Sequence, residues 1–183
     1  MGIPFEQRNF QKELDKKIAG FQKDGIVPTL LLHSCCAPCS SHCIEYLSDY
    51  FHITVFYYNP NISAEEEYRK RVEEQKRFIS EFPAKYKVSF IEGDYDTKEF
   101  YDIAKGYEQC REGGERCFRC YELRLRKTCE TAKAGGFDYF TTTLTISPLK
   151  NSVRLNEIGL KLSEEYDCLL YTSPSPRDGA TSR

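Results

Sequence analysis

Cysteine is the residue type whose spacing in this sequence most clearly indicates chemistry. Cys117 and Cys120 form a Cys-x-x-Cys pair, which lets two thiolates reach one metal ion or cluster. Cys35 and Cys36 are adjacent and directly follow a short apolar run that predicts a buried strand. If the two groups converge, four thiolates are available for a zinc ion or a 4Fe–4S cluster. Because compact structural zinc sites usually draw on two spaced pairs, the adjacent cysteines favour the cluster.

The remaining cysteines divide into one further candidate ligand and several inert thiols. Cys39 and Cys43 are four residues apart on an expected helix and so share a face. Cys39 is near enough to Cys36 to join the site or hold a second metal, whereas Cys43 is interpreted as a small buried hydrophobe. Cys110 and Cys129 have no metal-binding spacing and are interpreted as core or surface thiols.

Three titratable residues lie near expected strand ends and are candidate catalytic groups. His33 precedes the first cysteine pair, where its imidazole can donate a proton or satisfy a backbone group. Asp94 and Asp96 follow the expected third strand, where carboxylates can act as acids or metal ligands. Turn formation is the alternative role for both aspartates.

Basic residues gather around the second cysteine pair. With Lys150 and Arg154 they predict a phosphate-binding rim. Acidic residues are interleaved with them, so ion pairs on a solvated helix face would give the same composition. The formal net charge of −2 gives no overall attraction to nucleic acid. The basic residues are Arg111, Arg116, Arg119, Arg124, Arg126 and Lys127, and the acidic ones are Glu112, Glu115 and Glu122.

The elements that must position these groups alternate between helix and strand. This order predicts a mostly parallel sheet with helices on both faces. Ligands bind such sheets beyond the carboxyl ends of the strands. Expected strands span residues 29–33, 53–58, 88–91 and 138–143, and expected helices span 5–23, 38–47, 65–82, 97–105, 117–132 and 151–166. Ser63 and Glu66 are expected to form a capping box at the start of the third helix.

Length and composition fit one globular domain. The 183 residues are 40% hydrophobic, and no apolar run approaches the roughly 18 residues of a membrane helix. The N-terminus lacks the features of a secretory signal, so we expect a cytoplasmic protein without membrane contact. The nine cysteines are then better suited to metal or thiol chemistry than to disulfides.

The last sixteen residues differ in character from the rest. The Pro/Ser-rich string from Cys168 onward is similar to the translation of a transposon-type sequencing adapter. We therefore expect a functional domain over residues 1–167 and a non-native tail over 168–183, and exclude Cys168 as a ligand.

Five motifs in sequence order resemble the epoxyqueuosine reductases of the QueH type. The resemblance covers about residues 30–167. The motifs are Leu32-His-Ser-Cys-Cys-Ala-Pro-Cys-Ser40, Phe56-Tyr-Tyr-Asn-Pro-Asn-Ile62, Ile91-Glu-Gly-Asp-Tyr-Asp96, Gly113-Gly-Glu-Arg-Cys-Phe-Arg-Cys-Tyr-Glu-Leu-Arg124 and Phe140-Thr-Thr-Thr-Leu-Thr-Ile-Ser-Pro-Leu-Lys-Asn151.

The resemblance implies a fold, a reaction and a set of site residues. The fold is a three-layer α/β domain of the adenine-nucleotide α-hydrolase-like (HUP/PP-loop-related) type. The reaction is the last step of queuosine synthesis, in which epoxyqueuosine at the tRNA wobble position loses its epoxide oxygen as water. An unidentified low-potential donor supplies the electrons. The implied 4Fe–4S ligands are Cys35, Cys36, Cys117 and Cys120, with Cys39 as candidate ligand of an additional iron. Candidate substrate residues are Asn59, Asn61, Arg116, Arg119, Ser147, Lys150 and Asn151.

The chain departs from the family at its end, where members continue with another strand and a Cys-x-Cys pair. We therefore expect a sheet that lacks its last strand. Two other functions remain as alternatives. An ATP-dependent tRNA sulfurtransferase needs a Gly-rich phosphate loop after the first strand, where this chain has cysteines instead. A zinc-binding RNA module is the non-enzymatic alternative.

Overall fold

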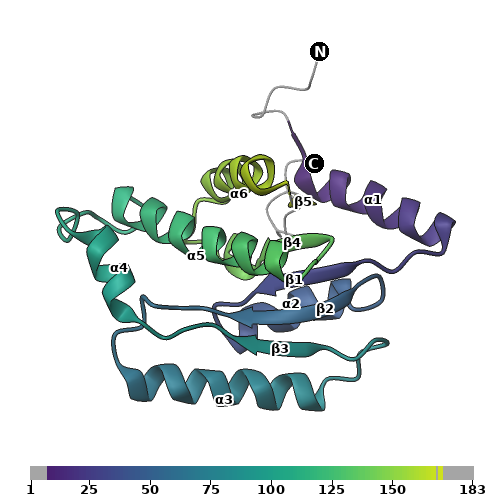
Figure 1. Ribbon diagram of the computed structural model, residues 1–183, viewed down its shortest axis with the longest axis horizontal. Helices are drawn as coiled ribbons and strands as arrows, with labels where there is room; N and C mark the ends of the chain where they lie inside the picture. The colour runs from purple at the N-terminus through teal and green to yellow at the C-terminus, as the bar shows by residue number, and fades with distance from the viewer. Residues whose placement is uncertain (1–7, 168, 171–183) are drawn as a thin grey trace.

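A parallel sheet forms the centre of the computed structural model, which describes residues 8–167 and 169–170 (Figure 1). Its strand order is β3-β2-β1-β4-β5. The central strand β1 pairs in parallel with β2 on one side and with β4 on the other. The strands are β1 (Thr29–His33), β2 (His52–Tyr57), β3 (Ser89–Glu92), β4 (Tyr139–Thr142) and β5 (Leu169–Leu170).

The direction of chain progression reverses beside β1. Strands β1, β2 and β3 run outward to one edge, and the chain then returns to place β4 on the other side of β1. This is the switch point at which doubly wound sheets bind their ligands. The loop after β1 and the turn after β4 therefore meet at one place, and the first cysteine pair lies in that loop.

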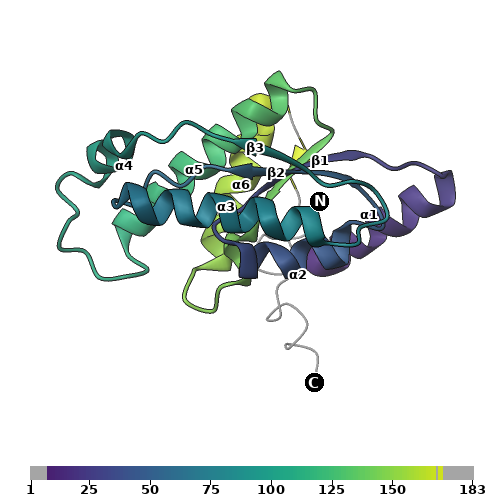
Figure 2. The same ribbon diagram turned by 90° about the horizontal axis from the view of Figure 1, so that it is seen from below.

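Helices cover both faces of the sheet and complete the expected three layers (Figure 2). Helices α1 (Phe10–Asp24), α2 (Ala37–Leu47) and α3 (Glu65–Glu81) pack on one face, and α5 (Glu115–Ala134) and α6 (Ser152–Tyr166) pack on the other. The short helix α4 (Thr97–Ala104) contacts α5, and the 3-10 turn η2 (Thr143–Ile146) follows β4 directly.

The apolar run of β1 explains why this strand is central. Leu30 and Leu32 point to the core beneath α1 and α2, while Leu31 points to the core beneath α5 and α6. All three side chains are completely buried. A strand buried on both faces needs such a continuous apolar sequence, because successive side chains alternate between faces.

Helix boundaries follow local capping, with one correction to expectation. Asn9 caps α1, and Gly25 ends it in the left-handed conformation with φ of 66°. The expected start at residue 5 lies outside the described residues. The expected capping box on α3 is wrong: the N-cap is Ala64, without a side-chain hydrogen bond. Ser63 lies one residue too early to cap this helix.

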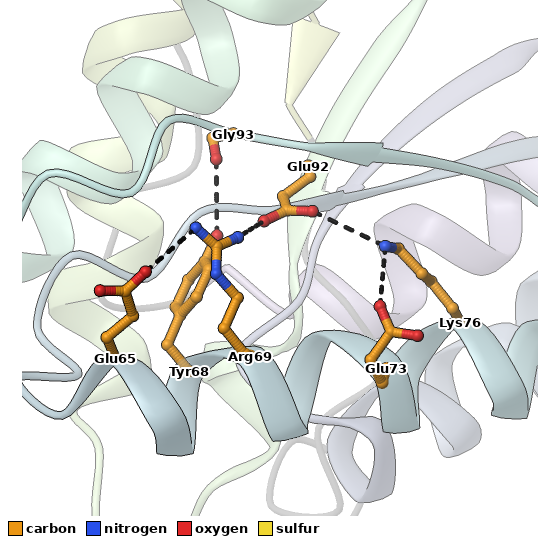
Figure 3. A network of polar contacts seen from close by, with 7 residues as sticks. All are labelled: Glu65, Tyr68, Arg69, Glu73, Lys76, Glu92 and Gly93. Atoms are coloured by element: carbon orange, nitrogen blue, oxygen red, sulfur yellow. Dashed lines mark hydrogen bonds and ion pairs between the residues drawn. The ribbon is translucent and has the colours of Figure 1, made fainter.

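A surface charge network ties α3 to the edge strand β3 (Figure 3). Glu92 accepts from Arg69 Nη1 at 2.7 Å and lies 3.7 Å from Lys76 Nζ. Tyr68 donates its hydroxyl to the Gly93 carbonyl at 3.4 Å. Exposed ion pairs contribute little stability each, about 0–1 kcal/mol, but charge along an edge strand also discourages pairing with other chains.

The last strand of the sheet is short. Leu169–Leu170 pair with Tyr139 and Phe140 of β4 although they belong to the segment expected to be foreign. Residue 168 and residues 171–183 lie outside the described part of the chain, so the proposed boundary of the tail stays a prediction. Among the residues that are described, no helix has both the length and the apolar character needed to cross a bilayer.

Candidate metal centre

The loop after β1 brings three thiols together. Cys36 is the N-cap of α2, and Cys39 lies in the first turn of this helix, so the helical turn brings Cys39 close to Cys36. The sulfur atoms of Cys35, Cys36 and Cys39 all lie within 4.8 Å of one another, and the Cys35 and Cys36 sulfurs are 3.7 Å apart. Tetrahedral thiolates at about 2.3 Å from one metal ion lie about 3.8 Å apart. The three cysteines therefore suit a metal, and the expected proximity of Cys39 is confirmed.

The electrostatics of this group concentrate negative charge on one sulfur. Hydrogen bonds with Cys36 and then Cys39 lower the pKa of Cys35, with further contributions from the charge of Arg124 and the hydroxyl of Thr143. The same bonds to Cys35 raise the pKa of Cys36 and the pKa of Cys39. These shifts favour the thiolate form at Cys35 over its two neighbours, and a bound cation would replace the protons of the thiols.

A buried glutamine binds the two serine side chains that flank the cysteine loop. Gln75 of α3 is completely buried, and its Oε1 accepts from Ser34 Oγ at 2.8 Å and from Ser40 Oγ at 3.0 Å. The two serines lie on either side of the three cysteines. Sequence reasoning missed Gln75, because a lone glutamine within a charged amphipathic helix gives no signal of this role.

The second cysteine pair lies at the start of α5 and lines a cavity. Cys117 Sγ accepts the backbone N–H of Gly113 at 3.3 Å, and Gly113 has the positive φ of 80° that favours glycine. Cys120 is buried. The cavity has a volume of about 250 Å³ and is lined by Asn61, Phe100, Glu112, Arg116, Cys117, Cys120, Tyr121, Arg124 and Lys150.

The two cysteine groups border the same core but remain distinct. Cys35 and Cys117 both pack against the apolar cluster beneath α5 and α6. Within the described chain, one group of three or more His, Cys, Asp or Glu residues has all its ligand atoms within 4.8 Å of one another. This group is Cys35, Cys36 and Cys39. A cluster shared by Cys35, Cys36, Cys117 and Cys120 therefore stays a prediction. The inert thiols behave as expected: Cys43 and Cys129 are buried in the two cores.

For His33 the sequence left two roles open, donation of a proton or a hydrogen bond to a backbone group, and the structure shows the second. Its ring is completely buried, with Nδ1 2.9 Å from Thr142 Oγ1 and Nε2 3.0 Å from the Tyr58 carbonyl. Burial, aided by the positive charge of Arg124, lowers the pKa of His33 to about 3. A neutral imidazole with both nitrogens engaged is not placed to give a proton to a substrate.

The two candidate aspartates also have structural positions. Asp96 caps α4 and accepts the backbone N–H of Lys98 at 2.9 Å. Asp94 is exposed and lies outside the residues that line the cysteine cavity. The turn-forming alternative accounts for Asp96, and neither carboxylate joins the cysteines here.

Of the expected substrate residues, three line the cavity. Asn61, Arg116 and Lys150 are at least partly exposed there. Arg116 has the Glu108 carbonyl as its hydrogen-bond partner, at 3.0 Å. Arg119 instead donates to the Tyr107 hydroxyl at 2.9 Å and pairs with Glu115.

The other three expected substrate residues serve the backbone. Asn59 is buried, donates to the Ser34 carbonyl at 2.9 Å and accepts from Arg124. Asn151 caps α6 by accepting the N–H of Arg154. Ser147 accepts the Lys150 N–H on its carbonyl oxygen, within the turn before α6. These contacts are intramolecular, and the expected substrate role of Asn59, Asn151 and Ser147 stays a prediction.

Comparison with known proteins agrees with the motifs that meet at this site. The family model described as epoxyqueuosine reductase QueH matches residues 30–181. The chain belongs to the QueH family. The epoxyqueuosine reductase QueH of Streptococcus pyogenes serotype M1 is 39% identical over 165 residues, which cover 89% of this chain and 65% of that protein.

Other members of the family give similar matches. The QueH of Haemophilus influenzae is 42% identical, and the match covers 78% of this chain and 57% of that protein. The QueH of Thermotoga maritima is 34% identical, and the match covers 83% of this chain and 77% of that protein. The chain thus spans about two thirds of the length of the curated relatives it matches first. The crystal structure of TcCGT1 in complex with UDP aligns with 80% of this chain and 28% of its own, at a TM-score of 0.43 and 7% identity, a likeness too weak to support a conclusion.

Proposed function

We propose that this chain reduces epoxyqueuosine to queuosine in tRNA, the last step of queuosine biosynthesis. The reaction takes two electrons and two protons and releases the epoxide oxygen as water. The observation that carries this proposal is the placement of a thiol-rich loop at the switch point of a doubly wound sheet, where ligands of such sheets bind. The names of the QueH relatives support the same reaction.

We further propose that Cys35, Cys36, Cys117 and Cys120 hold a 4Fe–4S cluster, with Cys39 as a ligand of an additional iron. The donor set fits, because thiolates are the ligands of such clusters and one cysteine of each group, Cys35 and Cys117, packs against the same core. When bound, the cluster would supply the electrons that remove the epoxide oxygen. The residues of the chain hold the thiolates: Thr143 donates to Cys35, and Gly113 N–H to Cys117.

The cavity beside Cys117 and Cys120 is the proposed entry for the modified nucleotide. Arg116 and Lys150 lie at its wall without a carboxylate ion-pair partner among residues 8–167, so they are available to phosphate oxygens of tRNA. Glu112 is the one acidic residue that lines it. A low-potential electron donor, which we leave unassigned, completes the set of partners.

The two alternatives receive less support. A sulfurtransferase would need a glycine-rich phosphate loop, but the loop after β1 is Ser34-Cys35-Cys36 and leads into α2 without a glycine. A zinc-binding RNA module agrees with the cysteines but not with the names of the relatives.

The test is conversion of epoxyqueuosine-containing tRNA by the anaerobically reconstituted chain with a low-potential reductant. Nucleosides from digested tRNA are quantified by mass spectrometry. We expect queuosine to form with the unmodified chain and with Cys110→Ala, because Cys110 lies outside the proposed ligand set. Cys117→Ala and Cys120→Ala should abolish it. Full activity of either variant would refute the ligand assignment, and no conversion by a cluster-loaded chain would refute the function.

A further inference from the structure

Arg124 of α5 is a buried arginine that forms no ion pair with a carboxylate of the described residues. Its side chain lies in the interior with the residue only 4% exposed. Arginine is almost never buried to this degree unless it is paired, because removing a guanidinium from water costs several kcal/mol.

The hydrogen-bond partner of Arg124 is neutral. One terminal nitrogen donates to the amide oxygen of Asn59, while Nε is buried and has no hydrogen-bond partner among the described residues. No carboxylate in residues 8–167 forms an ion pair with Arg124. Two other arginines of the same helix do form ion pairs: Arg119 pairs with Glu115, and Arg126 pairs with Glu122 and Glu165.

The position of Arg124 relates it to both cysteine groups. It follows Cys120 by four residues, on the same face of α5, and lines the cavity together with Cys117 and Cys120. Asn59 connects it to the cysteine loop, because the Asn59 amide donates to the Ser34 carbonyl at 2.9 Å.

We infer that Arg124 is the positioned counter-charge for the anionic thiolate-bound cluster, and that Asn59 holds it there as a neutral acceptor that leaves its charge uncompensated. This inference rests on the proposed function, since it requires that the two cysteine groups share a cluster. Arg124 is a positioning residue in this account, acting through the cluster and not on the substrate.

The consequence is a specific effect on reduction. Adding an electron makes a thiolate-bound cluster more negative, so a nearby buried cation stabilises the reduced form and raises the midpoint potential. Removing the cation should make reduction harder. An arginine whose role is only structural would affect folding without shifting this equilibrium in a charge-dependent way.

The test measures the midpoint potential of the reconstituted cluster in charge variants, by anaerobic titration followed by electron paramagnetic resonance. We expect Arg124→Gln to disfavour reduction at least tenfold, a shift of about 59 mV to more negative potential for a one-electron couple. Arg124→Lys keeps the charge and should stay close to the unmodified chain. The control Arg126→Gln changes the net charge equally on the same helix, and we expect no comparable shift.

A second pair of variants covers the case in which Arg124→Gln does not fold. Asn59→Asp and Asn59→Ala both lose the amide donor to Ser34, but only the aspartate neutralises Arg124 in place. We expect a more negative potential in Asn59→Asp than in Asn59→Ala. Equal potentials within this pair, or an unchanged potential in a folded Arg124→Gln variant, would overturn the inference.

Two further outcomes separate this inference from the proposed function. If the unmodified chain assembles no cluster, the proposed cofactor fails and the inference falls with it. If the cluster forms and its potential ignores Arg124, while tRNA affinity falls in Arg124→Gln, then Arg124 is a phosphate ligand and the inference alone is overturned.

Discussion

Thr143 and Cys35 contact each other twice across the switch point of the sheet. The Thr143 hydroxyl donates to the Cys35 sulfur at 3.4 Å and accepts the Cys35 backbone N–H at 3.2 Å. The two residues are 108 positions apart in the sequence and meet because β1 and β4 are adjacent parallel strands. The turn after β4 thus contributes to the environment of the first cysteine group.

Replacing Thr143 by valine should raise the pKa of the Cys35 thiol. The substitution keeps the shape but removes a hydrogen bond to the thiolate, which is worth about 0.5–1.5 kcal/mol, or up to roughly one pKa unit. Thiolate absorbance of the metal-free chain, followed against pH without oxygen, measures the change. Thr143→Ser keeps the hydroxyl and should titrate like the unmodified chain, so a similar rise in both variants would contradict the assignment.

His33 should make the fold less stable in acid. The pKa of His33 is lowered from 6.5 to about 3 in the folded chain. Below pH 6.5 the unfolded chain takes up a proton on this residue, but the folded chain does not until the pH approaches 3. The stability that the neutral His33 contributes above pH 6.5 is therefore lost as the pH falls toward 3. Between pH 7.5 and 5.0 the loss from this group is about 2 kcal/mol. Urea unfolding at both pH values measures the free energy of unfolding. Its decrease from pH 7.5 to 5.0 should be smaller by that amount in His33→Gln than in the unmodified chain. Equal decreases in the free energy of unfolding of the unmodified chain and of His33→Gln would contradict a buried neutral His33.

Arg116 and Lys150 should contribute more to tRNA binding than Arg119 does. The first two are available at the cavity wall, while Arg119 is engaged by Tyr107 and Glu115. Arg116→Gln and Lys150→Gln should each weaken binding and reduce the slope of log affinity against log salt by roughly 0.7–0.9. Arg119→Gln is the matched control on the same helix. A larger effect of Arg119→Gln in fluorescence titrations would place the RNA elsewhere.

Leu125 should be essential to the layer formed by α5. Its side chain is completely buried between α5 and the sheet, so Leu125→Ala should lower the free energy of unfolding by about 2–5 kcal/mol. Leu149 in the loop before α6 is 71% exposed, and Leu149→Ala should change it by less than about 0.5 kcal/mol. Denaturant unfolding of the two metal-free variants measures both free energies of unfolding. Equal decreases in Leu125→Ala and Leu149→Ala would contradict this description of the core.

The elements that carry the strongest periodic signals were predictable from sequence. Strand β1 has the expected bounds because its apolar run is buried on both faces. Helix α6 begins after Asn151 and ends at Tyr166, close to the expected range. The cap of α3 was wrong because capping depends on which residue leaves the helical conformation, and Ser63 and Ala64 are not distinguished by spacing alone.

The proximity of Cys39 to Cys35 and Cys36 was predictable from the sequence, but the residues that support these cysteines were not. The intramolecular contacts of Asn59, Asp96 and Asn151 could not be predicted, because the side-chain types that bind ligands also cap helices and close turns. The partners Gln75 and Thr143 were missed, since their contacts join segments distant in sequence and follow only from the order of the strands.

If the two cysteine groups hold one iron–sulfur cluster, the anaerobically purified chain should contain both iron and acid-labile sulfide, and chemical analysis measures the content of each. We predict about four iron and four acid-labile sulfide per chain for the cluster, with iron above that number where Cys39 holds a further ion. Cys120→Ala should lose the sulfide, and Cys110→Ala should keep it. A colourless chain with one zinc and no sulfide would contradict the account.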